Sequence, residues 1–113
     1  MDTQVGQYEL THPGEDAVEL TAVLSALAEP ARLTIVRTVA GCTSEGGMAC
    51  SEVMEKSGLT ATKSTMSHHY KVLRDAGVVE MWWTGPKKRV RLRRGDLDAR
   101  WPGLLDAVLK RDA

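Results

Sequence analysis

The chain has 113 residues, which is enough for one small domain with a modest core and too few for two. Its two cysteines are too few for a disulfide scaffold, and no apolar stretch is long enough for a signal peptide or a membrane span. We therefore expect a reduced, cytoplasmic protein that has no membrane partner.

The formal net charge of zero hides an uneven distribution of charged residues. Residues 1–57 carry three basic and nine acidic side chains, whereas residues 58–113 carry twelve basic and six acidic ones. The segment 63–94 alone has nine basic residues against Asp75 and Glu80. Such a segment is typical of a surface that faces a polyanion, and equally of a solvated surface with internal salt bridges.

The N-terminal residues are polar, lack periodicity and contain the breaker His12-Pro13-Gly14. No repeat and no low-complexity segment divides the rest of the chain. We therefore expect a flexible tail over 1–14 and one folded domain over 15–113.

Four helices are expected before residue 77, and most of their ends carry a local signal. Pro30 suits a first helical turn, and Ser51 and Thr62 are good N-caps. Gly77 suits the end of a helix, and apolar residues at helical spacing connect these signals. The expected helices cover residues 15–28, 30–40, 52–57 and 63–76, and a polar loop covers residues 42–50.

After Gly77 the period of the apolar pattern changes to two, which indicates strands. Arg89, Arg91 and Arg93 would share one face of the second strand. The strands are expected over 78–83 and 88–93, their turn over 84–87, and a final helix from Pro102 after a short turn over 96–100.

The expected order is helix, helix, short helix, tight turn, helix, basic hairpin, helix. A short helix, a turn and a second, polar-faced helix form a helix-turn-helix, and the hairpin makes it winged. A helix fits the major groove of DNA, where hydroxyl, imidazole and basic side chains reach base edges and phosphates. The sequence therefore predicts a mainly α fold with a small β-hairpin wing (α+β), and double-stranded DNA as the partner.

Three segments carry a resemblance to a known family: LSALAEPARLTIVRTVA, CSEVMEKSGL and KSTMSHHYKVLRDAGVVE. They are similar to the ArsR/SmtB family of bacterial winged helix-turn-helix repressors, although the turn over 60–62 is longer than the family's. The resemblance implies a repressor that binds an imperfect palindrome near a promoter as a homodimer, formed mainly by the first and last helices. The DNA-facing residues that it implies are Lys63, Ser64, Thr65, Ser67, His68 and Lys71 on the recognition helix, and Lys87, Lys88 and Arg89 at the wing tip.

Many members of that family sense metals, but both familiar metal sites are missing from this sequence. Ala49 and Ser51 occupy the positions of a Cys-x-Cys site, and no histidine follows His69, as the second type of site requires. Helical spacing turns His68 and His69 about 100° apart, so we expect His68 to face outward and His69 to pack. No cofactor is expected. The weak metal candidates are His12, Cys42 and Cys50.

Several other functions stay open. Cys42 and Cys50 flank a loop and can form a redox disulfide or an atypical metal site, and the signal can instead be sensed by a separate partner protein. Protein binding in place of DNA binding is a further alternative. An enzyme is not expected, because Ser67 and His68 point apart and no glycine-rich loop accompanies them. The tryptophans are expected to pack in the core and the dimer, or to line a small-molecule pocket; they are Trp82, Trp83 and Trp101.

Overall fold

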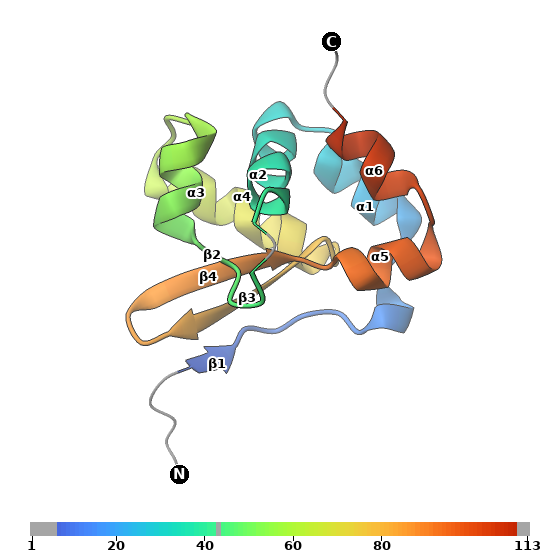
Figure 1. Cartoon of the computed structure of the whole chain (residues 1–113), viewed down its shortest axis with the longest axis horizontal. Coiled ribbons are helices and arrows are strands. Elements are labelled where there is room, and N and C mark those ends of the chain that lie inside the picture. Colours follow the sequence, from blue (N-terminus) through green and yellow to red (C-terminus); the bar gives the residue numbers. More distant parts are fainter. Residues whose placement is uncertain (1–6, 43, 111–113) are drawn as a thin grey trace.

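The structure is a computed structural model that describes residues 7–42 and 44–110, with the backbone alone for residues 7–9. A single 3-10 turn, Glu15–Ala17, precedes the first α-helix. The other elements, in chain order, are β1 (Gln7–Glu9), α1 (Leu20–Leu27), α2 (Pro30–Ala40), β2 (Met48–Ala49), α3 (Cys50–Ser57), α4 (Lys63–Asp75), β3 (Val79–Thr84), β4 (Lys87–Leu92), α5 (Arg94–Arg100) and α6 (Leu104–Leu109) (Figure 1).

The strands form one antiparallel sheet in the order β1-β3-β4-β2. Its centre is the β3–β4 hairpin, in which Val79 lies opposite Leu92 and Thr84 opposite Lys87. Gly85 makes the tight turn with a φ of +59°, a conformation that favours glycine. The tip of the hairpin lies at the left end of the molecule in Figure 1, away from α5 and α6.

The core lies between the helices and the hairpin, where the apolar sides of α1, α2 and α4 meet. On α4, the buried residues Met66, Tyr70 and Leu73 repeat at helical spacing, so one side of this helix is anchored. The largest fully buried side chains are Ile35, Leu73, Met81, Leu97 and Leu105. Burial of these side chains supplies the main favourable term for folding.

These elements form a winged helix-turn-helix of the α+β class, as the sequence predicts. α3, the connection over 58–62 and α4 make the helix-turn-helix, and the β3–β4 hairpin is the wing. Within the described ranges, the structure contains no helix with both the length and the apolar character that crossing a membrane requires.

The N-terminal segment differs from the expected tail. Gln7–Glu9 form β1, which pairs with β3 so that Gln7 lies opposite Thr84. The pairing continues beyond the strand, because the backbone amide of Met81 donates to Nε2 of His12 at 2.9 Å. This three-residue edge strand is stabilised by pairing with residues more than 70 positions away in the sequence, so local periodicity does not predict it. The expectation for residues 1–6 lies outside the described residues.

Two helices also begin at residues other than the expected ones. α1 begins at Leu20, because Val18 is extended and is buried beside Gly77 at the end of α4. α3 begins at Cys50 with Ala49 as its N-cap, not Ser51, and the Glu52 carboxylate accepts a hydrogen bond from the amide of Ala49 at 3.2 Å.

At the C-terminal end, the expected turn over 96–100 is part of a helix, α5. α6 begins at Leu104 rather than at Pro102, because Gly103 adopts a φ of +88°, which is not helical, just before it. The proline therefore lies in the turn between two helices.

Candidate nucleic-acid interface

α4 is the element that presents the predicted recognition residues, and both of its ends carry the expected signals. At its start, the Thr62 hydroxyl accepts a hydrogen bond from the amide of Thr65 at 3.1 Å. At its end, Gly77 turns the chain with a φ of +84°. Because the apolar side of α4 is buried in the core, its polar side faces outward.

All six predicted residues of α4 have exposed side chains. Ser64, Ser67, His68 and Lys71 are spaced i, i+3, i+4 and i+7, so they form one row on the outer face of the helix. Lys71 Nζ lies 2.7 Å from Asp75 Oδ2 in an exposed ion pair. Such a pair has little net strength in water, so the lysine remains available to a phosphate.

The wing tip contributes its three predicted residues unequally. Lys87 is exposed, whereas Lys88 and Arg89 are half-buried. Lys88 Nζ lies 5.7 Å from the centre of the Trp83 ring, so its ammonium group leans along the wing. The three side chains lie on the first half of β4, next to the turn.

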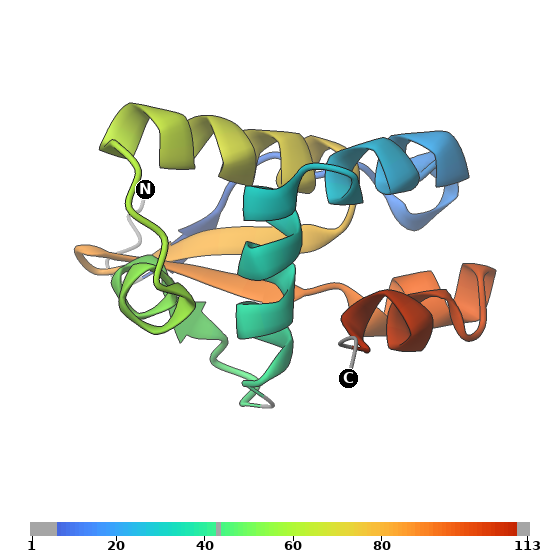
Figure 2. The same ribbon diagram turned by 90° about the horizontal axis from the view of Figure 1, so that it is seen from above.

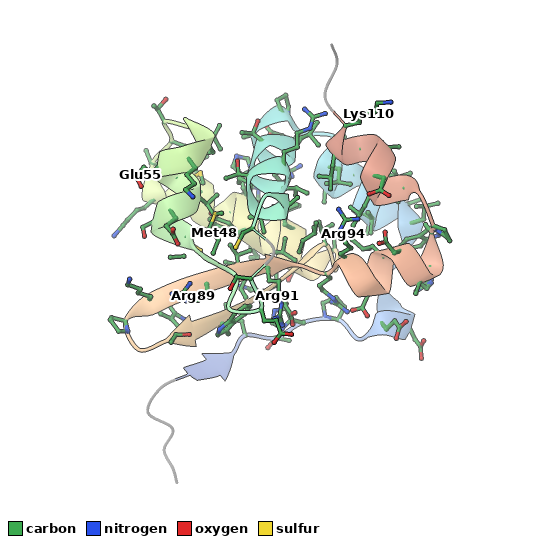
Figure 3. The ribbon with its side chains drawn as sticks, in the orientation of Figure 1. Met48, Glu55, Arg89, Arg91, Arg94 and Lys110 are labelled. Carbon is green, nitrogen blue, oxygen red and sulfur yellow. The ribbon has the colours of Figure 1, made fainter. Side chains whose placement is uncertain are left out.

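The basic segment is divided into paired and unpaired charges. Arg91 binds Glu80 at 2.6 Å, and Arg93, whose side chain is only 8% exposed, binds Asp96 at 2.9 Å. Arg94 contacts Asp98 and Asp106. Figure 3 shows Arg89 near the tip of the hairpin, followed by Arg91 and Arg94 away from it.

Among the described residues, the basic side chains of this segment with no ion pair are Lys63, Arg74, Lys87, Lys88 and Arg89. They belong to α4 and to the wing tip. Both interpretations of the charge pattern therefore apply: the arginines beyond the tip are salt-bridged, and the free positive charge is concentrated where DNA contact is expected.

The comparisons with known proteins agree with this geometry. Residues 27–81 match a family model described as a helix-turn-helix domain. The uncharacterized HTH-type transcriptional regulator YceK of Bacillus subtilis (strain 168) is 34% identical over 86 residues, which cover 76% of this chain and 82% of that protein. The chain belongs to the helix-turn-helix transcriptional regulators. It is a DNA-binding protein that regulates transcription.

The matched part of this regulator, residues 27–81, runs from the end of α1 into β3 and so contains α3, the turn and α4 entire. The remainder of the wing and the last two helices lie outside it. The family model therefore identifies the helix-turn-helix, and the structure identifies the wing.

The neighbouring histidines of the regulator lie in opposite environments, as their spacing predicts. His68 is exposed, whereas His69 is 8% exposed and its Nδ1 lies 3.2 Å from Nη1 of Arg32. Because the guanidinium can only donate, Nδ1 is the acceptor in this contact. Arg32 also donates from Nε to the carbonyl of Ala26 at 2.7 Å, so it joins the end of α1 to α4.

The weak metal candidates have other contacts in the regulator. His12 accepts the hydrogen bond from Met81 described above, and the Cys42 thiol donates to the carbonyl of Gly47 at 3.5 Å. Cys50 lies at the start of α3. In the part of the chain that the structure describes, no three His, Cys, Asp or Glu side chains gather as a metal ion would need.

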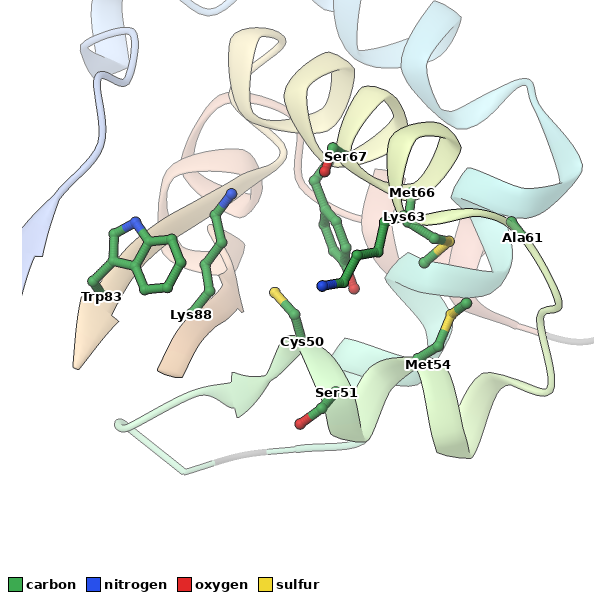
Figure 4. A pocket seen from close by; sticks show the side chains of 10 residues that line it. Cys50, Ser51, Met54, Ala61, Lys63, Met66, Ser67, Trp83 and Lys88 are labelled. Atoms are coloured by element: carbon green, nitrogen blue, oxygen red, sulfur yellow. The ribbon is translucent and has the colours of Figure 1, made fainter. Parts of the chain in front are cut away.

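Sequence reasoning missed one feature of this region, a cavity of about 630 Å³ between α3, α4 and the wing (Figure 4). Lys63 and Ser67 of α4 and Lys88 of the wing all line it. Trp83 lines it too, whereas the rings of Trp82 and Trp101 lie against Arg91 and Arg100. The tryptophan content indicated a pocket in general terms, but only the fold brings these elements together.

Two titratable groups in the cavity are shifted toward their neutral forms. Burial raises the pKa of the Cys50 thiol, and the nearby Lys88 charge offsets part of this rise. Burial also raises the pKa of the Tyr70 hydroxyl, and the Cys50 thiol raises it further. Both groups are therefore protonated near neutral pH and add no negative charge to the interface.

Proposed function

We propose that the protein is a homodimeric transcriptional repressor of the ArsR/SmtB type, which binds a palindromic operator with α4 in the major groove and the wing on the adjacent backbone. The observation that carries this proposal is the common surface of α4 and the wing. Lys63 and Ser67 of α4 line the same cavity as Lys88 of the wing, so the exposed polar side of α4 continues into the basic wing tip. Bound at a promoter, such a protein represses by excluding the polymerase.

The two parts of this surface have different roles in the proposal. Ser64, Ser67 and His68 have short polar side chains that suit base edges in the groove. The lysines Lys63, Lys71, Lys87 and Lys88, together with Thr65 and Arg89, bind phosphates and fix the position of the helix. Affinity therefore comes largely from the second group, and sequence preference from the first.

The proposed dimer uses α1 and α6. Leu20 and Leu24 on α1 are 37% and 45% exposed, the large apolar side chains that the described fold leaves most open. Leu104, Val108 and Leu109 on α6 are only partly buried. In Figure 2 these helices, in blue and red, lie at the end of the molecule opposite the hairpin tip. Pairing through this end leaves both copies of α4 free for two half-sites.

The test measures binding to DNA from the protein's own promoter region by fluorescence anisotropy at several salt concentrations. Each neutralised phosphate adds about −0.9 to the log–log slope of affinity against salt, so the proposal predicts a steep slope. The double variant Ser67→Ala/His68→Ala should lose specific binding while its fold, checked by circular dichroism, stays intact.

A matched pair of lysine variants isolates the role of position. Lys63→Gln should weaken binding and flatten the salt slope, whereas Lys110→Gln removes the same charge from the exposed end of α6, at the other side of the molecule (Figure 3). Equal effects of the two lysine variants, or unchanged DNA binding by Ser67→Ala/His68→Ala, would show that α4 is not the recognition helix.

A further inference from the structure

We propose that the cavity between α3, α4 and the wing binds a small amphipathic anion, with an apolar aromatic body and a carboxylate, and that this ligand competes with DNA. The competition rests on the function proposed above, whereas binding of the ligand does not. The cavity volume of about 630 Å³ lies in the range of small-molecule sites.

The walls of the cavity suit an apolar body. Met54 and Met66 lie at the end near Ala61, and Trp83 lies at the opposite end (Figure 4). Methionine side chains adapt to irregular shapes, and an indole ring offers a flat face for stacking. An aromatic molecule of one or two rings would therefore contact side chains from α3, α4 and β3 together.

The charges of the cavity select an anion. Lys63 and Lys88 line it from two different elements, and none of its ten lining residues is an aspartate or a glutamate. Cys50 and Lys63 point toward each other across the space between α3 and α4 (Figure 4). Because the Cys50 thiol is held neutral, it does not cancel the lysine charges. A carboxylate here would have two cationic partners and no anionic neighbour.

A buried hydroxyl without a partner marks the position for an acceptor. Tyr70 is 5% exposed and lines the cavity, and its hydroxyl makes no hydrogen bond of ordinary geometry with any described residue. Its polar neighbour, the Cys50 thiol, is a weak donor and a weak acceptor. Buried hydroxyls normally have a partner, and an unpaired one costs free energy. A ligand oxygen would supply the missing acceptor.

The competition follows from shared residues. Lys63, Ser67 and Lys88 belong both to the cavity lining and to the proposed DNA contacts. A bound anion would neutralise the two lysines that a phosphate needs, and its body would separate the wing from α4. The ligand would therefore lower DNA affinity directly, without a conformational relay between distant sites.

The test uses two probes of nearly the same shape, 1-naphthoate and the uncharged 1-naphthamide, in calorimetric titrations of the full chain without DNA. Naphthoate should bind the wild type at least about tenfold more tightly than the amide, because only the carboxylate meets the lysines. Lys63→Gln/Lys88→Gln should remove most of this difference. Tyr70→Phe should weaken naphthoate binding while it keeps the ring in place.

Two further variants separate the cavity from the general positive charge of the wing. Ala61→Trp fills the cavity and should abolish binding; Ser51→Trp, at an exposed lining position, serves the same purpose if the first variant does not fold. Lys87→Gln lies at the wing tip outside the cavity and should bind naphthoate as the wild type does. Absence of naphthoate binding, or equal binding by the filled variants, would overturn the proposal.

A DNA arm tests the competition separately. Naphthoate should release promoter DNA from the wild type and not from Ala61→Trp. Binding of naphthoate that leaves DNA affinity unchanged would overturn the competition. If the proposed function itself is wrong, the protein will not bind promoter DNA even without naphthoate, so the failures of the two proposals are distinguishable.

Discussion

At the scale of single residues, the pair His68-His69 shows how one step along a helix separates two roles. His69 is enclosed where α1, α2 and α4 meet, and Arg32 connects it to the carbonyl of Ala26. His68 has no such enclosure and faces solvent. Helical spacing alone predicts this division. The partner of His69 could not be predicted, because Arg32 lies 37 residues earlier and no local pattern links the two positions.

Replacing each histidine separately should therefore give opposite results. His69→Ala should lower the free energy of unfolding by about 1–3 kcal/mol, because it removes a buried side chain and leaves a donor of the partly buried Arg32 unpaired. His68→Ala should change it by less than about 0.5 kcal/mol and should weaken DNA binding instead. Urea unfolding and fluorescence anisotropy measure the two effects. Similar losses of stability would contradict the different environments of the two rings.

At the scale of elements, capping side chains help to fix where a helix begins. Glu29 caps α2 by accepting a hydrogen bond from the amide of Arg32 at 3.0 Å, which is the main reason that the pKa of its carboxyl is lowered. A lowered folded-state pKa means that the carboxylate stabilises the fold above its unfolded pKa of about 4.3. This contribution is lost as the pH falls through the lower, folded-state value.

The variant Glu29→Gln should expose this dependence, because it keeps the acceptor oxygen and removes the charge. Its melting temperature should lie below that of the wild type at neutral pH, and the two should converge in acid, once Glu29 is protonated. Calorimetric melts across the acidic range measure the difference. Glu55→Gln is the control, since this exposed carboxylate on α3 caps no helix. A gap between wild type and Glu29→Gln that persists in acid would rule out the charge as its source.

Two glycines that follow α3 and α4 make a second comparison. Gly58 and Gly77 have φ values of +76° and +84°, but a side chain at Gly58 would meet open space. A Cβ at Gly77 would lie 2.6 Å from Cγ2 of Val18. Gly58→Ala should cost about 1–2 kcal/mol from backbone strain alone, and Gly77→Ala should cost more, because Val18 must move. Urea midpoints measure both, and equal costs would show that Val18 adjusts freely.

The sequence predicts some of these elements much better than others. α2, α4 and the wing have strong local signals in Pro30, Thr62 and the alternation of the strands, and the structure has them at nearly the predicted bounds. β1 and the start of α3 depend on pairing with distant strands, which periodicity does not report. The cavity needs α3, α4 and the wing at once, so no single segment predicts it.

At the scale of the whole molecule, the two ends of the fold have different characters. Within residues 63–94, the unpaired positive charge lies on α4 and the wing tip, whereas the exposed leucines lie on α1 at the other end. Charge counts along the sequence indicated the basic part, but they overstate it, since Arg91, Arg93 and Arg94 are bound to carboxylates. Only the fold distinguishes the basic side chains that form ion pairs within the protein from those that remain available.

The proposed dimer gives a prediction at this scale. Leu24→Glu places a charge on the 45% exposed face of α1 and should shift the protein from dimer to monomer in sedimentation velocity runs. DNA affinity should fall with it, because one half-site alone is then bound. Ser64→Glu adds the same charge on α4 and should leave the dimer intact. A wild type that sediments as a monomer would contradict the proposed dimer, and a Leu24→Glu variant that sediments as a dimer would place its interface elsewhere.

The pairing of Gln7 with Thr84 has a practical consequence for labelling the protein. A tag or fluorescent protein joined ahead of Gln7 enters the molecule beside the hairpin turn, where it would obstruct the wing. One joined after Lys110 leaves from the end of α6, on the surface proposed for self-association. A dye on the exposed loop over 44–46 avoids both surfaces and is the better reporter for measuring DNA binding and assembly in one sample.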